Sequence, residues 1–191
     1  GLNPHIEDVA RRVALEGFVA LAPDFLSPVG GTPADEDKAR DMIRALDRTT
    51  TVEDAVAAVD YLAGHPASTG KVGAVGFCWG GALVNNLAVA DPDLDAAVSY
   101  YGRQPDASQV PEIQAPLLLH YGGLDERINA GIEAYEAALK ANGKEYQVYV
   151  YEGANHAFNN DTSQARYHPE AAELAWSRTI AFFKEKLAGE A

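Results

Sequence analysis

The stretch that decides the fold runs from Val72 to Ala90 and reads VGAVGFCWGGALVNNLAVA. Its first four residues are apolar or small, which is typical of a short buried strand. The alanine- and leucine-rich segment from Ala82 onward predicts a helix. Cys78 lies on the turn between them, flanked by Gly76 and Gly80, where a tight bend that lifts one side chain out leaves no room for a neighbouring Cβ. The pattern predicts a nucleophile elbow that carries Cys78.

Cys78 would then stand at the N-terminus of a helix, where the helix dipole favours a thiolate. The backbone amide of Trp79 is placed to donate to a developing oxyanion. The competing interpretation is an inert buried thiol, a common role for a lone cysteine. The glycines between a strand and a helix favour the nucleophile.

Apolar runs and helical patterns alternate along the rest of the chain. This alternation predicts the α/β class, with a largely parallel sheet covered by helices on both faces. In such sheets the chemistry gathers beyond the carboxyl ends of the strands. Further strands are expected at Phe18 to Ala22, Ala96 to Tyr101, Leu117 to Tyr121 and Tyr146 to Tyr151. Helices are expected at Asn3 to Glu16, Asp35 to Leu46, Thr51 to Leu62, with Thr50 and Glu53 at capping-box spacing, and about Ala171 to Leu187.

An acid and a histidine follow two of the predicted strands. Asp125 closes a Gly-Gly-Leu-Asp loop, and His156 closes a Gly-Ala-Asn-His loop. Taken alone, Asp125 is also typical of a helix cap, and His156 of a loop histidine bonded to backbone. Nucleophile, acid and histidine nevertheless occur in the chain order that hydrolases of this fold use. We therefore expect Cys78 as nucleophile, His156 as base and Asp125 as its orienting acid.

Length and charge narrow the class of protein. The 191 residues, 47% of them apolar, fit one domain over residues 1–191. Fifteen basic against 28 acidic residues give a formal charge of −13, which disfavours nucleic acid and anionic membranes as partners. A small-molecule partner fits better, with a monomer or homodimer as the assembly. One cysteine forms no internal disulfide, no long apolar run is present and no leader pattern opens the given sequence, so the expected default location is cytoplasmic. An export signal upstream of Gly1 is the open alternative.

Four motifs resemble landmarks of the dienelactone hydrolase family, in their usual order. They are Gly-Phe-Cys-Trp-Gly-Gly-Ala at 76–82, Tyr-Tyr-Gly at 100–102, His-Tyr-Gly-Gly-Leu-Asp at 120–125 and Asn-His-Ala-Phe at 155–158. The likeness covers essentially the whole chain. It implies an α/β-hydrolase fold and a Cys78–His156–Asp125 triad that cleaves small esters or lactones through a thioester, without metal or cofactor.

The resemblance also predicts that the folded protein has residues upstream of Gly1. The family places a glutamate and one oxyanion-hole amide just before a Gly-x-Asn segment that looks like Gly1 to Asn3. The family's third strand lies between the strands expected at Phe18 and Val72, so N-terminal strands are expected to be missing from this chain. Direct pairing of Phe18 to Ala22 with Val72 to Val75 would contradict this expectation.

The arginines that hold a substrate carboxylate in dienelactone hydrolase proper are only partly matched. One of the two family arginines lies in the region of Arg40 of this chain. The other follows the catalytic histidine by a few residues, where this chain has Asn159 and Asn160. Arg103 or Arg127 could replace it as an anion clamp, although each equally fits a surface salt bridge. Tyr101 is a candidate for the pocket wall or for the core.

Two other interpretations compete with the hydrolase. A hydrolase-fold protein could bind a ligand without catalysis, and a thiol-based redox or acyl-carrier role would need Cys78 alone. His156, Asp161 and His168 match no established metal-ligand spacing, so no metal is expected. His120 is expected to be a near-core histidine with satisfied hydrogen bonds.

Overall fold

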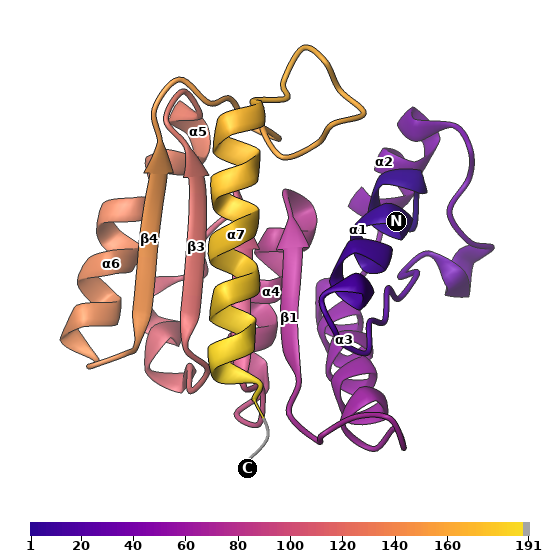
Figure 1. Cartoon of the computed structure of the whole chain (residues 1–191), viewed down its shortest axis with the longest axis horizontal. Helices are drawn as coiled ribbons and strands as arrows, with labels where there is room; N and C mark the ends of the chain where they lie inside the picture. Colours follow the sequence, from indigo (N-terminus) through magenta and orange to yellow (C-terminus); the bar gives the residue numbers. More distant parts are fainter. Residues whose placement is uncertain (189–191) are drawn as a thin grey trace. The chain divides into compact units, whose positions relative to one another are not determined.

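The computed structural model describes residues 1–188, and the chain forms two compact units, residues 1–70 and 71–191 (Figure 1). The first unit is helical, and the second contains the sheet. Among the described residues, no helix combines the length and apolar character needed to cross a membrane.

The first unit begins each of its α-helices with a side-chain cap. Asn3, Asp35 and Asp47 each accept a backbone N–H from the first turn, at 3.0, 3.0 and 2.8 Å. The predicted capping box at Thr50 and Glu53 is wrong, because the helix begins three residues earlier and Thr50 donates its own amide to Asp47. The elements are α1 (Pro4–Leu15), the 3-10 turn η1 (Ser27–Val29), α2 (Glu36–Arg44) and α3 (Arg48–Ala63).

The predicted strand from Phe18 to Ala22 is also wrong. The segment has no sheet partner among residues 1–188, and Val19 and Leu21 are 40% and 43% exposed. An apolar run becomes a strand only when another strand satisfies its backbone groups, and local sequence does not encode that partner.

The second unit contains a four-stranded sheet whose order along the sheet is the order along the chain. Every neighbouring pair is parallel, with Val98 opposite Leu118 and Leu119 opposite Val148. The two central strands are buried along their whole length, as expected for strands covered on both faces. The strands are β1 (Gly73–Phe77), β2 (Ala96–Tyr100), β3 (Leu117–Gly122) and β4 (Tyr146–Tyr151), within two residues of the predicted bounds.

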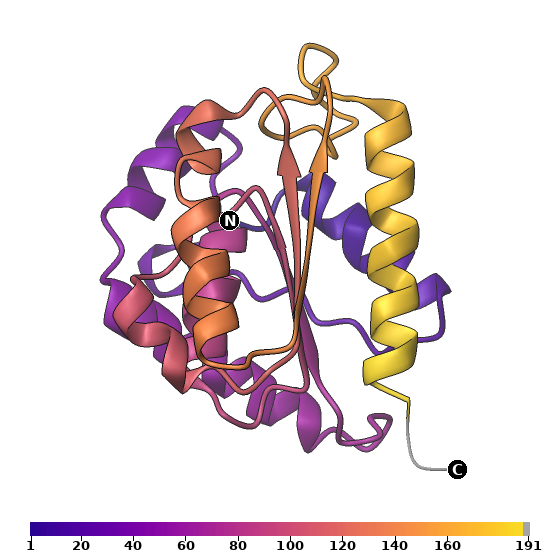
Figure 2. The same ribbon diagram turned by 90° about the vertical axis from the view of Figure 1, so that its left-hand side faces the viewer.

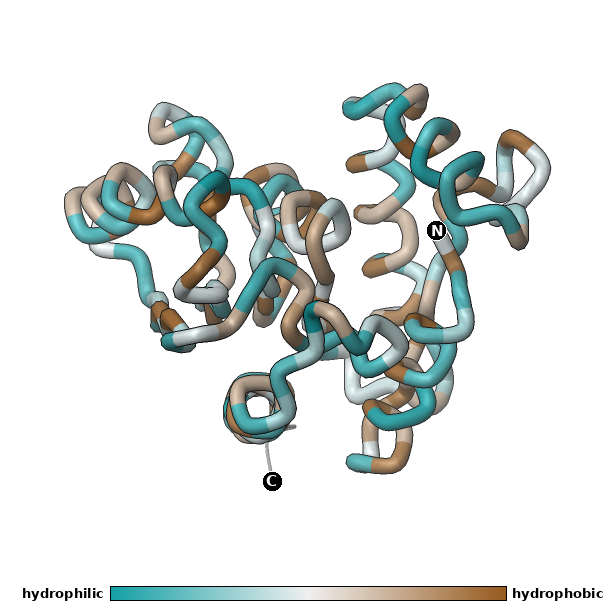
Figure 3. The backbone as a smooth tube through the Cα atoms, turned by 90° about the horizontal axis from the view of Figure 1, so that it is seen from above, coloured by the Kyte–Doolittle hydropathy of each residue, from teal (hydrophilic) through white to brown (hydrophobic). Residues whose placement is uncertain are grey.

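Helices cover both faces of this sheet, which confirms the predicted class. α7 (Pro169–Lys186) lies on one face, and α4 (Trp79–Ala90) and α6 (Ile132–Ala141) lie on the other (Figure 2). Seen end-on in Figure 3, α7 carries hydrophobic and hydrophilic residues around its circumference, and Thr179, Ile180 and Phe183 are among those buried. The remaining elements are the 3-10 segment η2 (Ala107–Glu112) and the short α5 (Glu126–Asn129).

Candidate active site

The sharp turn that carries Cys78 forms where the sequence predicts it, between β1 and α4. Cys78 has φ 56° and ψ −115°, a conformation that is rare for a residue with a side chain and is found mostly at functional sites. Two backbone hydrogen bonds hold it, from the Cys78 amide to the Tyr100 carbonyl and from the Ala82 amide to the Cys78 carbonyl, both 3.0 Å. The Cys78 side chain is exposed at the carboxyl end of the sheet.

The glycines around the elbow differ in what they permit. A Cβ on Gly76 would lie 2.0 Å from the Gly80 carbonyl oxygen, so position 76 has no room for a side chain. A Cβ on Gly80 would meet nothing within 4 Å, so the expectation that both flanks exclude one is wrong for Gly80. The second position with no room for a side chain is Gly81. A Cβ added there would lie 2.7 Å from the Tyr100 carbonyl oxygen, where α4 approaches β2.

Asp125 combines the two roles considered for it. As N-cap of α5, its Oδ1 accepts the Ile128 amide at 3.4 Å. Its Oδ2 lies 2.5 Å from His156 Nδ1, and the side chain is buried. The cap leaves the second carboxylate oxygen directed at the imidazole, so the short helix orients the acid.

The loops that carry Asp125 and His156 pack directly against each other. A Cβ on Gly122 would lie 2.6 Å from the Asn155 carbonyl oxygen, so glycine permits the approach. The Leu124 amide donates to the Ala154 carbonyl at 3.0 Å, which ties the two loops together.

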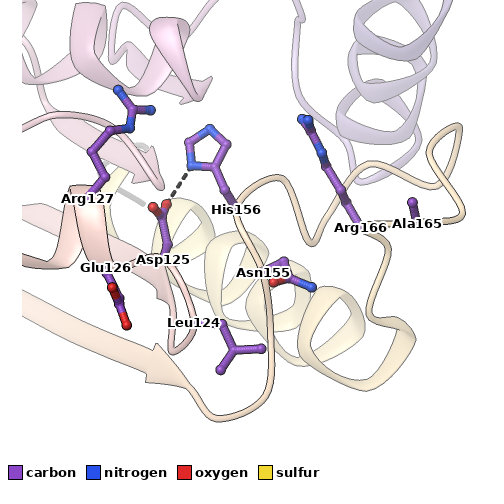
Figure 4. A pocket seen from close by; sticks show the side chains of 8 residues that line it. All are labelled: Leu124, Asp125, Glu126, Arg127, Asn155, His156, Ala165 and Arg166. Atoms are coloured by element: carbon purple, nitrogen blue, oxygen red, sulfur yellow. Dashed lines mark hydrogen bonds and ion pairs between the residues drawn. The ribbon is translucent and has the colours of Figure 1, made fainter.

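The structure brings the three predicted residues into one hydrogen-bonded row. His156 Nε2 lies 3.0 Å from Cys78 Sγ. The other ring nitrogen of His156, Nδ1, faces the carboxylate of Asp125 (Figure 4). The carboxylate can thus fix the imidazole with its second nitrogen directed at the sulfur, which is the geometry of a nucleophile, a base and an orienting acid.

The electrostatics of the row favour an ion pair between sulfur and imidazole. Partial desolvation by the surrounding protein would by itself raise the pKa of Cys78, but the hydrogen bond and charge of His156, with the amide of Trp79 and the charge of Arg127, bring that pKa below its usual value. The pKa of His156 is raised, first by its bond to Cys78 and, against burial, also by Asp125. A thiolate facing an imidazolium is therefore favoured nearer to neutral pH than for an isolated cysteine.

A pocket of about 560 Å³ opens beside the row. Arg127 and Arg166 line it on opposite sides of His156 (Figure 4). Neither guanidinium has an ion-pair partner within residues 1–188, in contrast to the paired Arg40. Sequence reasoning selected Arg127 and missed Arg166, which lies in an irregular loop with no motif to mark it. The other lining residues are Leu124, Asp125, Glu126, Asn155 and Ala165.

The remaining predicted substrate residues lie in different settings. Tyr101 is 1% exposed, with its ring centroid 5.0 Å from that of His156, so it forms a buried support for the histidine. Burial raises its pKa, which keeps the phenol neutral. Arg103 is exposed after β2 and is not part of the pocket lining. Arg40 lies on α2 in the first unit, where it pairs with Asp37 and Glu36.

Known proteins resemble the chain over nearly its whole length. The family model described as "Dienelactone hydrolase family" matches residues 1–187. An Escherichia coli O157:H7 protein named "Putative carboxymethylenebutenolidase" is 33% identical over 97% of this chain and 73% of its own length. A Bradyrhizobium protein named "Probable 2-oxo-3-(5-oxofuran-2-ylidene)propanoate lactonase" is 32% identical over 100% of this chain and 82% of its own.

A solved structure gives the same result for the fold. The crystal structure titled dienelactone hydrolase-like promiscuous phosphotriesterase P91, from metagenomic libraries, is similar with a TM-score of 0.86 at 29% identity. The match covers 98% of this chain and 83% of that one.

Proposed function

Because the chain belongs to the dienelactone hydrolase family and is a lactone or ester hydrolase, we propose that Cys78, His156 and Asp125 act as its catalytic triad through a thioester acyl-enzyme. The observation that carries the proposal is that His156 bridges the other two, 3.0 Å from the sulfur and 2.5 Å from the carboxylate.

In the first half-reaction, the Cys78 thiolate attacks the carbonyl carbon of the ester or lactone. A carbon–sulfur bond forms, and the carbonyl electrons move to the oxygen, to which the Trp79 amide donates. When the carbon–oxygen bond breaks, the His156 imidazolium protonates the leaving oxygen. The product of this step is a thioester on Cys78.

In the second half-reaction, neutral His156 accepts a proton from water as the water attacks the thioester. Asp125 holds the imidazole in orientation and stabilises its charged form. The carbon–sulfur bond breaks, the acid leaves and the thiolate forms again. Because a thiolate is itself a good leaving group, activated esters and enol lactones are favoured over amides and unactivated esters.

The pocket arginines support a substrate that carries an anionic group. Of the two replacements expected from the sequence, Arg127 lines the pocket and Arg103 does not. A guanidinium binds a carboxylate by two parallel hydrogen bonds, and one without an ion-pair partner is free to do so. We therefore propose that Arg127 binds the carboxylate of the substrate. Arg166 lies on the opposite side of the same pocket.

The triad is tested by burst release of p-nitrophenol from an activated acetate ester. Cys78→Ala is expected to abolish the burst, and His156→Ala to slow both the burst and the steady state. If neither substitution lowers turnover, the proposed mechanism is wrong. If only the cysteine matters, a role that needs the thiol alone is favoured.

The arginine assignment has a separate test with a matched control. Arg127→Met is expected to raise KM for a carboxylated ester about tenfold and to leave KM for the uncharged ester unchanged, because one charged hydrogen-bonded contact is lost. Loss of the positive charge near Cys78 should affect kcat for both esters alike. Arg103→Met removes an exposed arginine outside the pocket lining and should change neither substrate. Equal increases in KM for the two esters in Arg127→Met would contradict the assignment.

A further inference from the structure

A buried row of polar side chains lies between the sheet and α7, separate from the triad. His120 is 0% exposed, and both of its ring nitrogens are bonded, Nδ1 to the Tyr151 hydroxyl at 2.8 Å and Nε2 to the Thr179 hydroxyl at 3.1 Å. Arg178 donates to the Tyr151 hydroxyl at 3.2 Å, and Tyr100 shares the Thr179 hydroxyl at 2.7 Å. The expectation of a near-core histidine with satisfied hydrogen bonds is thus confirmed.

Counting protons fixes the direction of every bond in this row. The Thr179 hydroxyl has one proton, which it donates to the Ala175 carbonyl in a hydrogen bond of 2.9 Å. The Thr179 oxygen therefore accepts from the Tyr100 hydroxyl and from His120 Nε2. Burial, followed by the charge of Arg178, lowers the pKa of His120 to about 3, so the ring is neutral and its Nδ1 accepts from Tyr151. The chain of donors therefore runs from Arg178 through Tyr151 and His120 to Thr179.

The backbone of Tyr151 connects this row to both loops of the active site. Its carbonyl accepts the amide of Gly123, two residues before Asp125, at 2.8 Å. The same carbonyl accepts the amide of Ala154, two residues before His156, at 3.2 Å. The end of β4 is therefore the common attachment point of the acid and the base.

The start of α7 is attached to the histidine loop as well. The His168 amide donates to the Phe158 carbonyl at 3.0 Å, and His168 Nδ1 caps the helix by accepting the Ala171 amide at 3.2 Å. The Phe158 ring packs against the ring of Tyr151, with 5.1 Å between the two ring centroids. A shift of the Tyr151 side chain would thus be transmitted to the loop that carries His156.

We propose that Tyr151 is a positioning residue for the triad. Its hydroxyl, held between Arg178 and His120, fixes the end of β4, which continues into the His156 loop and whose last carbonyl accepts the amide of Gly123 at the start of the Asp125 loop. Tyr151 does not touch the reacting atoms, so it acts through the distance between His156 and Cys78. The inference rests on the proposed function.

The test compares Tyr151→Phe with Tyr149→Phe, two residues earlier on the same strand. The Tyr149 hydroxyl donates to the side chain of the exposed Gln147. The Tyr149 ring lies under the guanidinium of Arg178, and this cation–π contact is kept when tyrosine is replaced by phenylalanine. Tyr151→Phe is expected to lower kcat for the activated ester about three- to tenfold with KM unchanged, the effect of one lost buried hydrogen bond. It should also raise the apparent pKa of the Cys78 thiolate, followed by ultraviolet absorbance. Tyr149→Phe should change neither.

Thr179 supplies a second pair of variants in case Tyr151→Phe does not fold. Thr179→Val removes the hydroxyl at constant shape and should lower kcat, whereas Thr179→Ser keeps it and should restore kcat. Nitrogen chemical shifts of His120 should show a proton on Nε2 alone. Wild-type kcat and thiolate pKa in Tyr151→Phe and Thr179→Val would overturn the inference. The proposed function would still stand if Cys78→Ala is inactive, so the two failures are distinguishable.

Discussion

Gly76→Ala and Gly80→Ala are expected to have opposite effects on stability, although both glycines belong to the same sequence motif. An alanine Cβ at position 76 would lie 2.0 and 2.3 Å from the carbonyl oxygen and carbon of Gly80. Both atoms are backbone, so no side-chain rotation can relieve the overlap. At position 80 the new methyl group meets nothing within 4 Å.

The magnitudes follow from these distances. Overpacking costs about 1–3 kcal/mol, and a clash with fixed backbone belongs at or above the upper value, so we expect Gly76→Ala to lose about 3 kcal/mol or more. Gly80 is the second residue of α4, so exchange of glycine for alanine there should gain part of the roughly 1 kcal/mol of unfolding free energy that the exchange gains in a helix interior. For a chain of this size about 2–4 °C corresponds to each kcal/mol, so Tm should fall by roughly 6–12 °C for Gly76→Ala and rise slightly for Gly80→Ala.

Thermal unfolding followed by circular dichroism measures both changes, with the wild type scanned at the same rate. Urea unfolding gives an independent value of the free energy. Equal losses of stability in the two variants, or a larger loss for Gly80→Ala, would refute the reasoning about the elbow.

Asp125→Asn should lower kcat by roughly a hundredfold or more, because the amide cannot stabilise the imidazolium; steady-state kinetics on the activated ester would contradict this if the loss were small. His156→Ala removes the main group that lowers the pKa of Cys78, so the rate of iodoacetamide alkylation should titrate at higher pH than in the wild type; an unchanged profile would show that the thiolate does not depend on the histidine. Gly122→Ala would place a Cβ 2.6 Å from the Asn155 carbonyl oxygen, so it should separate the two loops and lower kcat together with Tm, and full activity would contradict the close packing of the loops.

Local pattern predicted the second unit well because its strands are short, buried and separated by helices. The four strands from β1 to β4 appear within two residues of their predicted bounds, and the chain order of the three polar residues predicted which strand ends would carry them. Parallel strands bring their carboxyl ends to one edge, so topology alone was enough to predict that Cys78, Asp125 and His156 lie near one another.

Features that depend on long-range partners could not be predicted. The apolar run at Phe18 to Ala22 has the composition of a strand, but pairing depends on a neighbour that local sequence does not name. Arg166 has no motif and enters the pocket only through the path of its loop. The freedom at Gly80 and the crowding at Gly81 depend on how closely α4 approaches β2, which is a tertiary distance.

The identical order of the strands in space and in sequence has a consequence for biosynthesis. During translation from the N-terminus, each newly made strand can add beside the one before it, and the cysteine leaves the ribosome 78 residues before its histidine. Until β4 and the loop beyond it are in place, the sulfur lacks the group that most favours its ionisation. A nascent chain that has not yet folded the His156 loop therefore lacks the group that most lowers the pKa of Cys78, and the thiolate is favoured only after that loop has reached the sulfur.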